Sequence, residues 1–114
     1  MTARRWRDYQ TSSGRRPVRE FLRSLSDEDA AEVVAAMTEV RQLGLQAARK
    51  LRNEIWEVRA DGNRVIHRIL FAQEGRRGFV LLALVGFTKK TQRTPPDVIL
   101  LAEQRLADWR SRGQ

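Results

Sequence analysis

The sequence predicts an α+β fold, in which an antiparallel sheet of about four strands carries helices packed on one face. Two observations lead to this prediction. Residues 51–94 contain three strand-like runs, separated by glycine-containing turns at Asp61-Gly62 and Glu74-Gly75. Before and after these runs, apolar residues recur every three or four positions, as they do along one face of a helix. The expected order of elements is therefore β-α-α-β-β-β-α.

Length and composition indicate one globular domain, which we expect to span residues 1–114. The hydrophobic content of 41% and the three tryptophans argue against disorder. No apolar run approaches the roughly 18 residues of a membrane span, and the N-terminus lacks the apolar core of a signal peptide. The chain has no cysteine and one histidine, which disfavours thiolate and histidine metal sites. We therefore expect a cytoplasmic protein without a metal or cofactor.

The net charge of +8 is unevenly distributed along the chain. Residues 1–25 hold 7 basic and 2 acidic side chains, whereas residues 26–44 hold 1 and 5. Residues 45–94 hold 11 basic and 4 acidic side chains, and residues 95–114 hold 3 of each. Positive charge therefore collects on the N-terminal segment and the predicted sheet. Such clustering is typical of a polyanion-binding protein, with nucleic acid as the first candidate and an acidic protein as the second.

The N-terminal elements follow from local patterns. Residues 5–10 alternate in polarity as a short strand does. Pro17 suits the first turn of a helix, because its missing N–H would have no partner there, and this helix ends near Leu25. Ser26 is the expected N-cap of a second helix with an acidic first turn. Gly44 is the expected C-cap of that helix.

The Asp61-Gly62 pair predicts a two-residue type I′ turn between the first two central strands. That turn sets the register of the hairpin and places Arg59 opposite Arg64. Residues 79–87 are nearly all apolar, as expected of a strand covered on both sides. Gly86 in this strand indicates a bulge or a close approach of another segment.

Side chains alternate between the two faces of a strand, so the predicted register sorts the charged residues. Glu57 then shares an exposed sheet face with Arg59, Arg64 and Arg68. The opposite face is expected to be the core, and it carries Trp56, Val58, Val65, His67, Ile69 and Phe71. Arginine forks bind phosphate oxygens in pairs, so the charged face is a candidate phosphate site. The alternative is that these charges only pair with one another on a solvated surface.

The last helix begins at the sequence Thr94-Pro95-Pro96-Asp97, which combines a hydroxyl cap, proline and an early acid. Its buried stripe is expected to consist of Val98, Ile99, Ala102, Leu106 and Trp109.

Three motifs resemble the HigB-like, phage-derived branch of the RelE/ParE toxin superfamily. They are Trp56-Glu57-Val58-Arg59, then His67-Arg68, and then the ten residues GFTKKTQRTP at 86–95. The resemblance covers nearly the whole chain, and the third motif is long and ordered. Two positions depart from the pattern, because many relatives have histidine at Val85 and tyrosine at His67. A lone histidine facing apolar residues is more often a satisfied core residue than a catalyst.

The resemblance implies a compact RelE-like fold and the toxin of a type II toxin–antitoxin system. Most characterised members cut messenger RNA on the ribosome without a metal and so inhibit translation. The implied partners are mRNA, the ribosome and an antitoxin, often of the helix-turn-helix type, which binds the toxin in a hetero-oligomeric complex. Two other functions suit the same fold: a ParE-like inhibitor that binds DNA gyrase, and an RNA-binding protein without catalysis.

For RNA cleavage, the expected nucleophile is the 2′-hydroxyl of the RNA itself. We expect a cationic cradle of Arg59, Arg64 and Arg68, closed by Lys89 and Lys90. Glu57 is a candidate general base, although neighbouring arginines would acidify it, so that it could instead orient them. A lysine among like charges is the rival acid or base. The predicted catalytic set is Glu57, Arg59, Arg68, Lys89 and Lys90, and the predicted RNA-binding set is Arg52, Arg64, Thr91 and Arg93.

Overall fold

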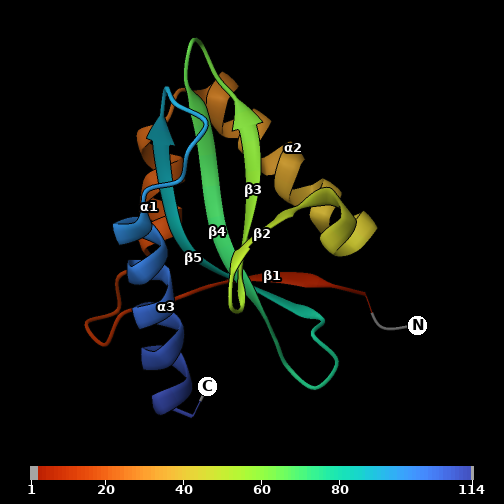
Figure 1. Cartoon of the computed structure of the whole chain (residues 1–114), viewed down its shortest axis with the longest axis vertical. Helices are drawn as coiled ribbons and strands as arrows, with labels where there is room; N and C mark the ends of the chain where they lie inside the picture. The colour runs from red at the N-terminus through yellow and green to blue at the C-terminus, as the bar shows by residue number, and fades with distance from the viewer. Residues whose placement is uncertain (1–2, 114) are drawn as a thin grey trace.

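The computed structural model describes residues 3–113 and confirms the α+β class and the expected order of elements (Figure 1). One short strand, β2, is added to that order, and a 3₁₀ turn at Gly44–Ala47 precedes it. No helix in the described part is long and apolar enough to cross a membrane. The helices are α1 (Pro17–Ser24), α2 (Asp27–Leu43) and α3 (Pro96–Ser111), and the strands are β1 (Arg5–Asp8), β2 (Arg49–Arg52), β3 (Ile55–Asp61), β4 (Ile66–Glu74) and β5 (Val80–Lys89).

The sheet has five strands rather than four and is mixed rather than antiparallel. Its order is β1-β5-β4-β3-β2, and β1 runs parallel to β5 while the other neighbours are antiparallel. The pairing of β1 with β5 joins segments about seventy residues apart in the chain, and no local pattern reports such a contact. The strand β2 is a short edge strand that turns back onto β3 through Asn53, which has a positive φ of 50°.

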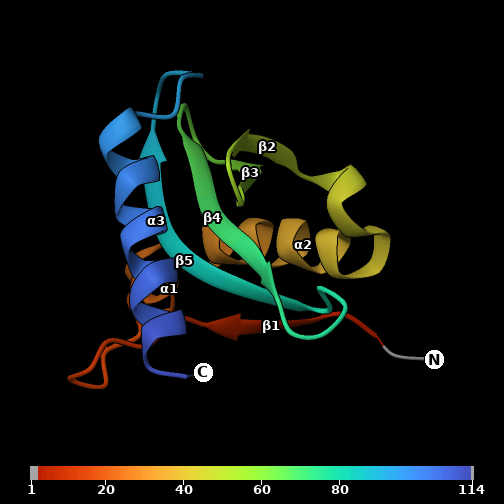
Figure 2. The ribbon, with the colours of Figure 1, turned by 60° about the horizontal axis from the view of Figure 1, so that its bottom comes forward.

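Helices cover both faces of the sheet, so the prediction of one covered face was wrong (Figure 2). Helices α1 and α2 pack on the face that carries Val58, Ile69 and Phe71. Helix α3 packs on the opposite face, over Ile55 and Leu70 among others. The stripe predicted for the last helix supplies this second core, because Ile99, Ala102, Leu106 and Trp109 are buried there.

The hairpin between β3 and β4 differs from the predicted one in register but not in facing. Arg59 lies opposite Arg68, not Arg64, because the turn is centred two residues further along the chain than Asp61-Gly62. Its tip is Asn63-Arg64, where Arg64 has a φ of 60°, and the Gly62 N–H donates to the Val65 carbonyl at 3.0 Å. The register moved by an even number of residues, so each side chain keeps its predicted face.

Local signals at the helix ends are mostly confirmed. The Ser26 hydroxyl accepts the Asp29 N–H at 3.1 Å, and Gly44 ends α2 with a φ of 81°. Gly86 allows the close approach that was expected: a Cβ there would lie 2.7 Å from Cγ of Phe21, on α1. Glycine at this position therefore lets α1 pack directly on β5.

Candidate functional site

The charged residues predicted to share a face do lie together, but they are buried rather than exposed. Glu57 on β3 retains 1% of its accessible surface and Arg68 on β4 retains none. Arg59 lies directly opposite Arg68, and Arg49 on β2 lies opposite Glu57. The prediction of a solvated face was wrong because the segment that joins β5 to α3, residues 90–95, folds over it.

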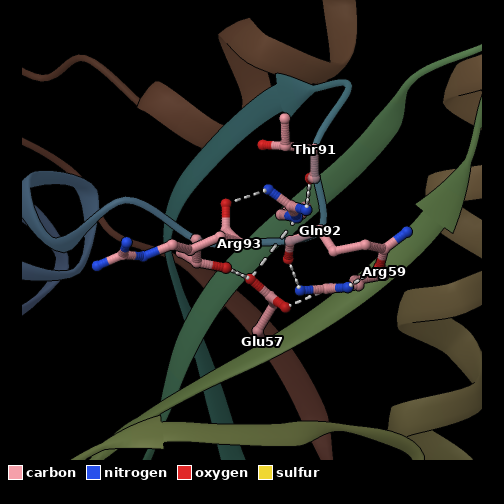
Figure 3. A network of polar contacts seen from close by, with 7 residues as sticks. Glu57, Arg59, Thr91, Gln92 and Arg93 are labelled. Atoms are coloured by element: carbon pink, nitrogen blue, oxygen red, sulfur yellow. Dashed lines mark hydrogen bonds and ion pairs between the residues drawn. The ribbon is translucent and has the colours of Figure 1, made fainter.

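Both carboxylate oxygens of Glu57 are engaged (Figure 3). Arg59 Nε donates to Oε1 at 2.5 Å, and the Thr94 hydroxyl donates to Oε2. Arg68 Nε lies 3.9 Å from the same Oε2. A carboxylate whose lone pairs are occupied in this way is suited to holding its neighbours in place, more than to accepting a proton from a substrate.

Arg68 holds the covering segment through main-chain groups. Its Nη1 donates to the Arg93 carbonyl at 3.3 Å, and its Nη2 donates to the Thr91 carbonyl. The guanidinium also lies over the Phe87 ring, with Cζ 5.6 Å from the ring centroid. Burial lowers the pKa of Arg68 below its usual value, as does the nearby Arg59 guanidinium, while Glu57 acts in the opposite direction.

Arg59 completes the clamp on residues 90–95. Its Nη1 donates to Oε1 of Gln92 at 2.7 Å, and its Nη2 donates to the Gln92 carbonyl at 2.5 Å. Figure 3 shows the Arg59 side chain lying between Glu57 and Gln92. The side chains of Arg59, Arg68 and Thr94 thus connect the loop of residues 90–95 to the buried carboxylate of Glu57.

The role predicted for the Thr94 hydroxyl was wrong. It was expected to cap α3, but the N-cap is Pro95, which has no side-chain capping bond. The hydroxyl donates to Glu57 instead. The charge-assisted bond to this carboxylate fixes the hydroxyl against Glu57, and no helix N–H donates to it.

Lys89 and Lys90 lie at the rim of this network. Lys89 pairs with Ile66 at the end of β5, on the same face of the sheet as Phe87 and Arg68. Lys90 follows directly where the strand ends. Both side chains are exposed, and within residues 3–113 neither has an ion pair or a side-chain hydrogen bond. Their charges are therefore available to a phosphate.

The predicted RNA-binding residues are scattered. Arg52 is paired with Glu103 of α3 at 2.6 Å, and Arg64 is exposed at the tip of the β3–β4 hairpin. Thr91 and Arg93 give only their carbonyls to Arg68, and their side chains are exposed. The Arg93 side chain points away from Glu57 (Figure 3). Of this set, only Thr91 and Arg93 adjoin the buried network.

His67 is a satisfied core residue, as its facing predicted. It is 2% exposed, on the α1/α2 face of the sheet. Its Nδ1 is 2.7 Å from the Thr88 hydroxyl, and its Nε2 is 2.8 Å from Oδ2 of Asp29. Both ring nitrogens therefore have partners, and the imidazole lies on the opposite side of the sheet from Glu57.

Sequence reasoning missed Gln92 and Thr94 as partners of the charged strands. Gln92 and Thr94 lie 33 and 37 residues from the side chains that they contact. The available signal was the amide and hydroxyl side chains in the segment TKKTQRT. A solvated loop does not require such side chains, so they indicated polar partners within the protein.

A known protein family matches most of this chain. Residues 20–107 match the family described as Phage derived protein Gp49-like (DUF891), which covers well over half of the sequence. The chain belongs to the Gp49-like family. The Gp49-like family is part of the RelE/HigB-like toxin superfamily, so the resemblance found in the motifs is confirmed at that level. Gp49-like membership also implies an antitoxin partner. Curated proteins give no significant match to this chain.

Proposed function

We propose that this Gp49-like protein is the toxin of a type II toxin–antitoxin system and, within the superfamily, a HigB-like mRNA endonuclease that acts on the ribosome. Family membership supports the toxin role. One observation supports cleavage: two exposed lysines, which have no ion pair within residues 3–113, stand at the rim of a buried network whose hydrogen bonds hold the segment that follows them. Rigid placement of cations is what stabilisation of a phosphorane requires.

The proposed reaction uses the RNA as its own nucleophile. The 2′-oxygen forms a bond to the adjacent phosphorus and loses its proton, while the bond from phosphorus to the 5′-oxygen breaks and that oxygen gains a proton. The products are a 2′,3′-cyclic phosphate and a 5′-hydroxyl. No metal is required, because the step needs only cations, an acceptor for the 2′-hydroxyl proton and a donor for the 5′-oxygen. Water at the exposed lysine rim accepts the first proton, and a lysine ammonium gives the second, so that protons and charge balance.

We assign two roles within the predicted catalytic set, and the burial and contacts of its residues support this division. Lys89 and Lys90 bind the scissile phosphate and stabilise the charge that develops on it, and a lysine ammonium protonates the leaving 5′-oxygen. Arg59, with 23% of its side chain exposed, extends the cationic edge. Glu57 and Arg68 are positioning residues, since both are buried and both contact the segment or its anchors rather than the surface.

The antitoxin, of the helix-turn-helix type, silences the toxin by forming a hetero-oligomeric complex.

The test is to induce Lys89→Ala and Lys90→Ala variants in cells and to map new 5′ ends of RNA. We expect the wild type to stop growth and to create codon-phased ends, and each variant to lose about 10²-fold or more of the cleavage. Lys50→Ala is the matched control, because Lys50 is an exposed lysine on the edge strand β2 whose neighbour across the ladder is Trp56. Antitoxin capture by all three variants should remain intact.

Equal toxicity of the two variants and the wild type would remove the assignment of the lysines. A DNA-damage response with intact transcripts would identify a gyrase inhibitor, and an absence of any growth effect would identify a plain RNA-binding protein.

A further inference from the structure

A surface pocket opens beside the buried network, between β2, residues 90–95 and the start of α3. Two of its lining residues, Gln92 and Thr94, also belong to that network. The pocket therefore adjoins the proposed cleavage site, on the side away from the lysines' strand. Its lining residues are Arg49, Leu51, Gln92, Arg93, Thr94 and Ile99.

The pocket combines an apolar wall with cationic edges. Leu51 and Ile99 supply the apolar surface, and both pack against the core under α3. Arg49 and Arg93 are exposed, and within residues 3–113 neither side chain has an acidic partner. By contrast, Arg52 on the same strand as Arg49 is neutralised by Glu103.

Most side-chain polar groups that line the pocket are hydrogen-bond donors; the exception is the Thr94 hydroxyl, which gives its proton to Glu57 and keeps only acceptor capacity. Two guanidinium groups have only N–H groups to offer. The side-chain carbonyl of Gln92 is occupied by Arg59, which leaves its NH₂ group as a donor. A ligand in this pocket must therefore be flat and apolar on its faces and rich in acceptors along its edge.

We propose that this pocket binds one nucleobase of the RNA strand, immediately beside the scissile phosphate, and that guanine is the preferred base. This inference rests on the proposed endonuclease function and names the part of its substrate that is read. Unstacked bases of single-stranded RNA are recognised by apolar contact and by arginine planes. Guanine presents two neighbouring acceptors, O6 and N7, which suit an arginine fork. A phosphate would need the cations but not the wall of Leu51 and Ile99.

The first test is to compare cut sites made by the wild type with those made by Arg49→Met and Arg93→Met. Methionine keeps an apolar stem and removes the donors. We expect the wild type to prefer guanine at one position next to the cut, and each variant to lose about tenfold of that preference. Lys50→Met removes one charge from the same strand outside the pocket and should keep the preference. Unchanged base preference in both arginine variants would overturn the proposal.

The second test does not depend on cleavage. The methyl resonances of Leu51 and Ile99 are followed by NMR while each of the four ribonucleoside 5′-monophosphates, or ribose 5-phosphate, is added to the full chain. We expect the largest shifts with guanosine monophosphate and none with ribose 5-phosphate. Equal shifts with ribose 5-phosphate, or no shift with any nucleotide, would overturn the proposal.

The endonuclease proposal and the pocket proposal can fail separately. If the wild type creates no RNA ends in cells, the endonuclease proposal fails, and the methyl titration still decides whether the pocket binds a base. If the wild type cleaves with no base preference and the methyls do not respond, the pocket proposal alone fails. Both arginines are exposed, so circular dichroism of the variants should match the wild type.

Discussion

The two faces of the sheet are built differently, although the same strands supply both. The face under α1 and α2 is almost wholly apolar among residues 3–113, and the buried His67 on it is hydrogen-bonded by Asp29 and Thr88. The face under α3 is apolar only where the helix lies. At the end where α3 has not yet begun, Glu57 and Arg68 are buried under a loop instead.

The difference indicates which half of the molecule is built for stability alone. Burying an ion pair is often no better for stability than burying apolar residues of similar volume. Charged residues are therefore a poor choice for filling a core. Their presence under residues 90–95 indicates that they serve to position this loop. That loop follows directly on Lys89 and Lys90, the exposed cations of the proposed site.

The largest effect should follow the removal of the buried carboxylate. Glu57→Ala leaves Arg59 without an acceptor for its Nε and the buried Arg68 without its counter-ion. We expect a loss of about 3–5 kcal/mol of unfolding free energy, and a loss of RNA cleavage. Urea denaturation measures the first quantity. The double variant Glu57→Leu/Arg68→Met, which replaces the pair by apolar groups, should recover most of the stability but not the cleavage. Recovery of both would show that the network has no positioning role.

A smaller effect is expected on the opposite face, where α1 meets β5. Gly86→Ala places a methyl group against the Phe21 ring, and a rigid core resists such overpacking. We expect a loss of about 1–3 kcal/mol of unfolding free energy, with cleavage per folded molecule unchanged. Adding Phe21→Leu should restore part of the stability. If Gly86→Ala is as stable as the wild type, the packing of α1 on this strand is looser than described.

His67, on the same α1/α2 face, is expected to contribute to stability but not to catalysis. His67→Gln keeps hydrogen-bonding groups near Asp29 and Thr88 but loses the ring, and we expect a loss of about 1 kcal/mol of stability. Cleavage, measured as new RNA ends per folded protein, should match the wild type. A stable variant that had lost cleavage would instead place the imidazole in the reaction.

The smallest effect concerns the surface ion pairs that tie α3 to the sheet. Hydrogen bonds from Arg110 lower the pKa of Glu54 below 4.5, and those from Arg52 and Asn53 lower the pKa of Glu103 below 4.5. Stability from a lowered carboxyl pKa is present above about pH 4.5 and is lost as the pH falls through the folded value.

These pairs are exposed, so the melting temperature should fall by only a few degrees over that acidic range, and less in high salt. Thermal melts of Glu54→Gln/Glu103→Gln should show a flatter dependence on pH. An identical acid dependence of wild type and variant would mean that other carboxyl groups are responsible.

Much of the fold could be predicted, because most elements have local signals. Pro17, Ser26 and Gly44 mark helix ends through backbone chemistry that acts within a few residues. The shared face of Glu57, Arg59 and Arg68 was predicted although the turn was not, since an even shift of register keeps each side chain on its face. The motif at 86–95 was likewise sufficient to predict the superfamily.

The candidate site was predicted less well, because its form depends on contacts between distant segments. That Glu57 and Arg68 are buried is not apparent from two charged residues in alternating strands. Burial follows from residues 90–95 crossing the strands, and the partners of Arg59 lie 33 residues away in the chain. The pocket beside the network likewise needs β2, the loop and α3 to meet.

By itself, then, the sequence determined the three helices, the strands other than β2, the facing of the residues in β3 and β4 and the superfamily, since periodicity and capping act over short distances. Only the tertiary structure decided that α3 covers the second face of the sheet, that residues 90–95 bury the charged end of that face, that β1 joins the sheet in parallel, and that the arginines hold this loop. These outcomes depend on which surfaces meet. An apolar stripe requires an apolar partner and a guanidinium group requires an acceptor, but neither determines which segment of the chain provides it.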